Sequence, residues 1–285
     1  MHGRLDLAFE KTSTSGTVLH IRRQEPPWRV LRAFPSGAGQ ALVHLHNTSG
    51  GVLGGDRLEL HVDLSPGARV QLTTTGATRV YRPRTDDAPA QSTAHFNLAE
   101  NSLLELLPDA LIPYRGCRFT QSATVNLAPG AALFWWELLA PGREASGEVF
   151  AFEQLHLEIA IRAGGVPIAL DRMLLDPQLR PLASPARLGS CRYLGTLYVC
   201  RAGEPAATWQ RLEEQLASQI EPPARPCTET TDRVIWGISS LVRDGVVVRG
   251  MAPSGAAVTQ GLREFWRAAR LLLTGEPASL PRKVY

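Results

Sequence analysis

Short stretches of alternating apolar and polar residues dominate the chain from Thr17 to about Tyr198. Residues 58–64 (LELHVDL) and 70–74 (VQLTT) are examples, and glycine, proline, asparagine and aspartate separate such stretches. Successive side chains of a β-strand point to opposite faces of its sheet, so a period of two is typical of strands with one buried face. The pattern therefore predicts a series of consecutive β-strands.

A weak internal repeat runs through this β-rich part. Residues 61–72 (HVDLSPGARVQL), 95–106 (HFNLAENSLLEL) and 124–135 (TVNLAPGAALFW) align without gaps. Each copy is an alternating strand, a four-residue turn and a second apolar strand. In the two Pro-Gly copies, proline fixes φ at the second turn position and glycine supplies the positive φ of the third. We interpret the copies as β-hairpins, and recurrence about every 30 residues predicts stacked, solenoid-like layers, with a β-sandwich as the alternative.

The pattern changes towards the end of the chain, where apolar residues recur at helical spacing. Amphipathic helices are predicted over residues 206–220 and from about Val258 to Leu273, and strands resume between them at residues 234–236 and 245–248. The predicted buried stripes include Leu212, Leu216 and Ile220 in the first helix and Leu262, Phe265 and Trp266 in the second.

These elements predict a single domain over residues 1–285. Its β body covers residues 1 to about 200, and a mixed helical and strand part covers about 201–285. The linker at residues 221–226 (EPPARP) is too short to divide independent domains. The predicted fold class is mainly β, with stacked hairpin layers in a solenoid-like or sandwich-like arrangement and two or so helices toward the C-terminus.

The composition excludes several classes of protein. Hydrophobic residues make up 44% of the 285 residues and charged residues 20%, as in ordinary folded domains. The net charge is only +3 and the arginines are scattered, so no nucleic-acid groove is indicated. No apolar run is long enough for a secretory signal or a membrane span, and we expect a cytoplasmic protein with no membrane partner.

Residues 49–57 (SGGVLGGDR) form the most conspicuous motif. The stretch lacks the Lys-Ser/Thr ending of a phosphate-binding loop and precedes a β pattern, so nucleotide binding is not expected. We expect Asp56 to brace the turn. The glycines that would permit sharp turns or close approach of the backbone are Gly50, Gly51, Gly54 and Gly55.

Three histidines are candidate metal ligands. His44 and His46 share one face of a predicted strand, and His61 would approach from a paired strand. The alternative is that they are half-exposed polar residues. No H-E-x-x-H motif occurs, so no fixed metal site is predicted. A small β metal-dependent hydrolase that uses this histidine cluster remains the alternative function.

Nucleophilic catalysis has little support in the sequence. No G-x-S-x-G motif occurs, and the four cysteines contain no C-x-x-C pair. Cys117 lies between Arg115 and Arg118, which would lower the pKa of its thiol, but a reduced structural thiol is the alternative. The carboxylates Glu105, Asp109, Glu137, Glu144 and Glu148 show no defined spacing for acid catalysis. We therefore predict that the chain is not an enzyme.

Four segments together resemble one known family. Residues 47–58 (NTSGGVLGGDRL), 72–81 (LTTTGATRVY), 105–113 (ELLPDALIP) and 141–148 (PGREASGE) occur in the order and approximate spacing of the urease accessory protein UreD, called UreH in some systems. The similarity extends from the opening Gly3 to the C-terminal helix.

The resemblance implies a mainly β metallochaperone scaffold that is required for nickel insertion into apo-urease. Such a protein docks on apo-urease and joins a helical partner of the UreF type and a GTPase of the UreG type. Nickel is then cargo in transit, not a tightly bound cofactor. Because Ni²⁺ binds N and O donors strongly, a conduit needs sparse, weak ligands.

Residues near the shared motifs are the candidates for such a conduit, and the alternative is that they cap turns or pair with arginines. Asp109-Ala110 stands where a variable polar or His-containing pair is expected, and the chain has only 7 histidines. An acidic or backbone path is therefore favoured over a histidine store. The candidate conduit residues are Asp56, Glu105, Asp109, Glu148, His44 and His46. The apolar stripe of the second helix, with Leu262, Phe265 and Trp266, is either a partner-docking face or packed against the β body.

Overall fold

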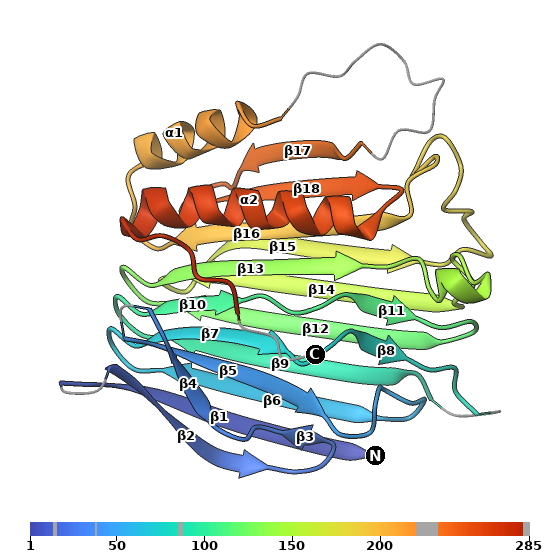
Figure 1. The fold of residues 1–285 in the computed structure, drawn as a ribbon, viewed down its shortest axis with the longest axis horizontal. Helices are drawn as coiled ribbons and strands as arrows, with labels where there is room; N and C mark the ends of the chain where they lie inside the picture. The colour runs from blue at the N-terminus through green and yellow to red at the C-terminus, as the bar shows by residue number, and fades with distance from the viewer. Residues whose placement is uncertain (14–15, 38, 85–87, 221–232, 282–285) are drawn as a thin grey trace.

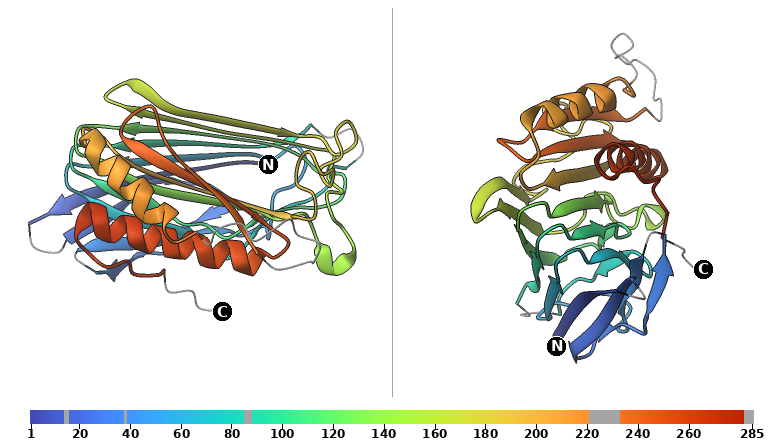
Figure 2. Two further views of the ribbon diagram at one scale, coloured as in Figure 1. Left: turned by 90° about the horizontal axis from the view of Figure 1, so that it is seen from above. Right: turned by 90° about the vertical axis from the view of Figure 1, so that its left-hand side faces the viewer.

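The computed structural model describes residues 1–13, 16–37, 39–84, 88–220 and 233–281. In this part of the chain, two β-sheets stack face to face, and two α-helices lie on the outer side of the second sheet (Figures 1 and 2). The mainly β fold with helices toward the C-terminus is thus confirmed.

The first sheet runs in the order β15 (Val166–Leu175), β14 (Gln154–Ala163), β12 (Arg118–Leu127), β9 (Ala90–Leu98), β6 (Arg57–Leu64), β1 (His2–Thr12) and β2 (Gly16–Gln24). The second sheet runs β17 (Ile235–Ser240), β18 (Gly245–Ala252), β16 (Tyr193–Arg201), β13 (Ala132–Leu139), β10 (Leu103–Leu106), β7 (Arg69–Thr74), β5 (Gln40–Asn47) and β3 (Trp28–Arg29). Short strands β4 (Ala33–Ser36), β8 (Thr78–Val80) and β11 (Leu111–Pro113) join the second sheet beside this path.

The copies of the sequence repeat stack in register, as the gapless alignment predicts. In the first sheet His61 of β6 pairs with His95 of β9, which pairs with Thr124 of β12, and all three strands are parallel. In the second sheet β7, β10 and β13 are likewise parallel and aligned. The prediction of solenoid-like layers is therefore confirmed for these three copies.

The interpretation of each copy as a hairpin is wrong. Strands β6 and β7 flank one turn, but β6 pairs with β1 and β9 whereas β7 pairs with β5 and β10. The turn therefore carries the chain from one sheet to the other. Its local signals specify a change of direction and leave the hydrogen-bonding partner of each strand open.

The turn chemistry itself is as predicted. The amide of Ala68 donates to the carbonyl of Ser65 at 3.0 Å, and Gly67 has φ of 70°. In the copy without Pro-Gly, Asn101 occupies the same position with φ of 54°. Asparagine tolerates this left-handed conformation better than most residues, so the turn is conserved in shape without glycine.

The two sheets differ in how many faces they bury. Inward residues of both sheets, such as Val62, Phe96 and Leu133, form one core between the sheets. On β13 the alternate residues Phe134 and Trp136 point the other way and form a second core with the helices. In the middle of the second sheet both faces are therefore buried, which explains the nearly continuous apolar sequences of β10 and β13, whereas β6 of the first sheet alternates.

The helices are α1 (Ala206–Ala217) and α2 (Gly255–Thr274), close to the predicted ranges, and a single 3₁₀ turn, η1, covers Glu144–Ser146. Strands β17 and β18 match the two strand predictions between the helices. The linker at residues 221–226 lies outside the described residues. Within the described residues, no helix has the length and hydrophobicity needed to cross a membrane.

Candidate functional site

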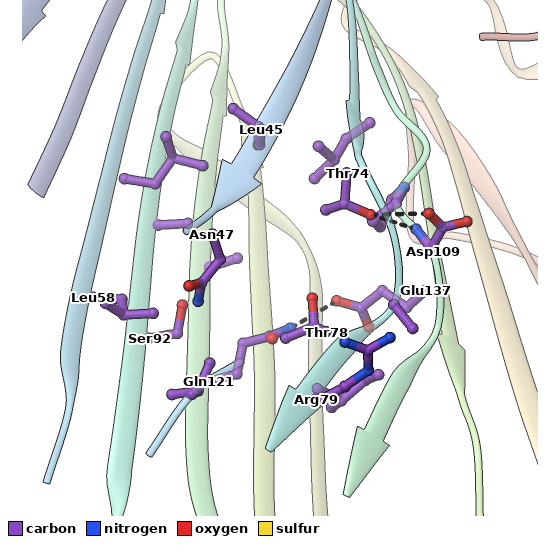
Figure 3. Close-up of a pocket in the computed structure, with 18 of the residues that line it drawn as sticks. Leu45, Asn47, Leu58, Thr74, Thr78, Arg79, Ser92, Asp109, Gln121 and Glu137 are labelled. Carbon is purple, nitrogen blue, oxygen red and sulfur yellow. Dashed lines mark hydrogen bonds between the residues drawn. The ribbon is translucent and has the colours of Figure 1, made fainter. Parts of the chain in front are cut away.

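A cavity of about 400 Å³ lies between the two sheets. It occupies the end of the stack where β5, β7 and β10 finish and where β6, β9 and β12 begin. Its walls are largely apolar, and a few polar side chains reach into it from both sheets (Figure 3). The polar residues labelled there include Asn47, Thr74, Ser92, Asp109, Gln121 and Glu137.

The glycine-rich stretch forms part of one wall. Gly50 and Gly51 line the cavity, and a Cβ atom on Gly51 would lie only 2.3 Å from Cε2 of Tyr81. Gly50 has φ of +76°. The side-chain amide of Asn47 donates to the carbonyl of Gly51 at 3.0 Å and holds the loop against the end of β5. The expected close approach of the backbone is thus observed at Gly51.

The second half of the stretch makes a turn. Gly54 and Gly55 lie between Leu53 and Asp56, and Gly55 has φ of +78°. Asp56 is buried and accepts hydrogen bonds from the amide of Leu53 at 2.9 Å and from the Met1 amino group at 2.8 Å. Asp56 therefore braces the turn from outside the cavity lining.

Asp109 lies in the connection between β10 and β11. Its amide donates to Oγ1 of Thr74 at 2.9 Å, which fixes the connection to the end of β7. Asp109 also lines a second cavity of about 240 Å³, whose other walls include Thr259 and Arg263 of α2. Together with Pro108, Asp109 thus belongs to the boundary between the inter-sheet cavity and a hollow beside α2.

Glu137 is a functional candidate that was not selected from the sequence. Like Leu133 and Trp135, it is one of the alternate residues of β13 that point toward the space between the sheets. Nε2 of Gln121 lies 3.4 Å from its Oε1. Burial disfavours the charged form and raises the pKa of Glu137 to about 6. A carboxylate in the inward phase of an otherwise apolar strand was the signal available in the sequence.

Glu105 lies on the opposite face of the second sheet, below α2. Its side chain is fully buried and accepts hydrogen bonds from Nε of Arg270 at 2.8 Å and from Nε1 of Trp266 at 3.0 Å. Gln40 and Gln71 donate to its other oxygen at 2.6 and 3.0 Å. Four donors therefore occupy this carboxylate, and it fastens α2 to the sheet.

Glu148 is paired with arginine. Nε and Nη2 of Arg143 donate to its two oxygens at 2.9 and 2.5 Å, and the amide of Arg115 donates at 3.2 Å. The hydrogen bonds from Arg143 lower the pKa of the Glu148 carboxyl. Both Glu105 and Glu148 thus have the bracing contacts that were the alternative to a conduit role.

Comparison with known proteins identifies the family. The sequence profile described as "UreD urease accessory protein" matches residues 1–285. The chain belongs to the UreD family.

The urease accessory protein UreD of Herpetosiphon aurantiacus is 42% identical over 289 residues, which cover 100% of this chain and 97% of that protein. The urease accessory protein UreD of Acaryochloris marina is 34% identical over 282 residues, which cover 99% of this chain and 94% of that protein. That from Delftia acidovorans is 32% identical over 292 residues, which cover 98% and 92%. Membership of the UreD family places the chain among the proteins of urease maturation.

The histidine cluster considered as an alternative site does not assemble. His44 and His46 lie on β5 in the second sheet, whereas His61 lies on β6 in the first sheet. The ring of His44 contacts Phe34 edge-on, and burial lowers the pKa of His46. Among the residues that the structure describes, no three His, Cys, Asp or Glu side chains gather as a metal site.

The apolar stripe of α2 packs inside this chain. Leu262, Phe265 and Trp266 are at most 3% exposed and belong to the core between α2 and the second sheet. Trp266 meets Trp136 of β13 edge-on, with 5.9 Å between ring centroids. Of the two interpretations of this stripe, packing against the β body is the one observed. These side chains are not available as a docking face in this conformation.

The cysteines within the described residues are buried and free of disulfide bonds. Burial raises the pKa of Cys117 to about 12, which fits the structural thiol of the two alternatives and not a thiol activated by Arg115 and Arg118. Loss of hydration is the largest cause of this rise. Cys227 lies outside the described residues.

The anchor at Glu105 predicts a large loss of stability on neutralisation. Replacing Glu105 with glutamine removes the buried carboxylate 2.8 Å from the Arg270 guanidinium and leaves only Glu276, at 3.5 Å, as its anionic partner. We expect the free energy of unfolding to fall by about 3 kcal/mol. Urea denaturation measures this value. Glu264→Gln, on the exposed face of α2, is the control. A loss for Glu105→Gln as small as that of the control would contradict the anchoring role.

The raised pKa of Glu137 predicts that ionisation of this carboxyl lowers the free energy of unfolding as the pH rises. Its ordinary value is 4.5 and its folded value is about 6, so the folded state holds the proton more tightly. The penalty is absent below pH 4.5, develops up to about pH 6 and is complete above it. Relative to wild type, Glu137→Gln therefore gains about 2 kcal/mol of stability between acidic and neutral pH. Denaturation at a series of pH values tests this, with exposed Glu100→Gln as the control; an offset that is independent of pH would contradict it.

Proposed function

We propose that this chain is a metallochaperone scaffold for nickel insertion into apo-urease. It docks on apo-urease in the cytoplasm and recruits a helical partner of the UreF type and a GTPase of the UreG type. The chain itself carries out no catalysis, and nickel is its cargo. Full-length membership of the UreD family supports the role in urease maturation.

The position of Asp109 carries the proposal of an internal nickel path. Asp109, Pro108 and Leu138 line both the inter-sheet cavity and the hollow beside α2. An ion that moves between these two spaces passes the Asp109 carboxylate. We propose that this carboxylate is the step between a partner-facing entrance beside α2 and the space between the sheets.

The polar lining has the chemistry of a transit site. Carboxylate, amide and hydroxyl oxygens of Glu137, Gln121 and Thr74 lie among apolar walls, and oxygen donors hold Ni²⁺ less tightly than imidazole or thiolate clusters. Because the pKa of Glu137 is about 6, cation binding there competes with a proton near neutral pH. Both features favour release over storage.

The other candidate residues have supporting roles in this proposal. Asp56, Glu105 and Glu148 already accept hydrogen bonds from the chain's own groups and hold the cavity walls and α2 in place. His44 and His46 lie on the side of β5 that faces away from the inter-sheet core. The proposed path therefore depends on Asp109 and Glu137.

Nucleotide hydrolysis belongs to the GTPase partner in this scheme. The glycine-rich stretch at residues 49–57 lacks a phosphate-binding loop motif and forms a cavity wall followed by β6. The scaffold then contributes position and a path, and the partner contributes the energy source and timing.

The test is the nickel content of urease in cells that lack this gene and are then complemented. We expect apo-urease after deletion, nickel-loaded urease after restoration of the wild-type gene, and strongly reduced loading with Asp109→Asn plus Glu137→Gln. These substitutions keep side-chain shape and remove the charges that hold the cation. Glu100→Gln serves as the control, and co-purification with urease checks that the complex forms.

Each result has a separate meaning. Fully loaded urease without the chain would overturn the maturation role itself. Normal loading with the double variant in an intact complex would leave that role standing and overturn the proposed path.

A further inference from the structure

Two histidines meet on the outer face of the first sheet, away from the cavity. His61 of β6 and His95 of β9 occupy directly paired positions on parallel strands. Their neighbours in sequence, Val62 and Phe96, point into the core between the sheets, so the imidazoles point outward. The two ring centroids are 5.0 Å apart, and the planes are inclined by 36°.

This separation fits two imidazoles that bind one metal ion. With a metal–nitrogen bond of about 2.1 Å, an ion lies about 3.3 Å from each ring centre. Two ligands at angles of about 90–109° at the metal then have ring centres about 4.7–5.4 Å apart. The observed 5.0 Å falls within that range before any side chain moves.

The surroundings favour a neutral imidazole and a bound cation. Burial and the neighbouring His61 lower the pKa of His95, so this ring has a free nitrogen lone pair near neutral pH. Oε2 of Glu59 lies 4.0 Å from Nε2 of His61, and Asp6 of β1 occupies the paired position on the other side of His61. Arg4 is a neighbouring positive charge that is engaged by Asp6 and Glu59, and Nε2 of His2 also lies 3.1 Å from Oε1 of Glu59.

We propose that His61 and His95 form a surface site for a borderline divalent transition-metal ion. Imidazole nitrogen suits Ni²⁺, Cu²⁺ and Zn²⁺, and with two protein ligands the remaining positions belong to water. The site is therefore weak and open to exchange. It lies on the opposite side of the first sheet from the proposed nickel path and does not depend on that path.

Equilibrium dialysis of the purified chain against NiCl₂ tests the site. We expect His61→Asn and His95→Asn each to lose about one equivalent of bound Ni²⁺ relative to wild type, because a single imidazole no longer chelates the ion. Asparagine suits this face, since Asn97 and Asn126 already stand beside the pair on β9 and β12 and bond to each other at 2.9 Å.

Two controls separate this site from others. His20 on β2 is an exposed histidine 3.4 Å from Glu10 but lies apart from the pair, so His20→Asn should bind as wild type does. The double variant Asp109→Asn plus Glu137→Gln should also keep the equivalent of Ni²⁺ bound at His61 and His95, whether or not the proposed nickel path exists. Unchanged Ni²⁺ binding in both His61→Asn and His95→Asn, when the circular dichroism spectra of the variants match that of the wild type, would overturn the proposal.

Discussion

The structure depends on apolar side chains that stack in register between the two sheets. Val62, Phe96 and Val125 repeat at one position of successive layers and face Val70 and its counterparts across the core. Each such residue contributes about 1.5–3 kcal/mol when it is fully buried. Because successive layers are in register, equivalent inward residues form a column through the stack, and each one contacts its counterparts in the neighbouring layers. At the end of the stack that the cavity occupies, the inward residues include the polar Ser92 and Gln121 of the first sheet and Glu137 of the second.

The second sheet links this cavity to the helices. Strand β10 carries Glu105, which holds Arg270 and Trp266 of α2, and a few residues later the same segment reaches Asp109 at the boundary of the two hollows. One buried ion pair thus fixes both the helix that walls the outer hollow and the segment that separates it from the inner one. A contact with no direct role in metal transit therefore sets the geometry on which the proposed transit depends.

The sequence predicts the strands, the layer register and both helices because these follow from local periodicity. It fails on the pairing within each copy of the repeat, since a turn motif does not say whether the next strand joins the same sheet. The alignment of the copies already placed His61 and His95 at equivalent positions, yet only parallel stacking turns equivalence into contact. For Leu262 and Trp266, amphipathicity shows a buried face but leaves open whether the chain itself or a partner covers it. The role of Glu105 depends on Arg270, which lies 165 residues further along the chain, so this pairing had to be seen in three dimensions. Glu148 instead pairs with Arg143 of its own segment 141–148, a contact that the sequence left as one of two alternatives.

The central claim is that nickel passes through the space between the sheets, and blocking that space tests it most directly. Ser92 of β9 points into the cavity (Figure 3). Thr93 is the next residue of the same strand and is not among the residues that line the cavity. Nickel content should be measured in urease matured by the Ser92→Tyr chain and by the matched Thr93→Tyr chain, each shown to co-purify with urease. The account predicts depleted nickel with Ser92→Tyr and normal nickel with Thr93→Tyr. Full loading with Ser92→Tyr would contradict it.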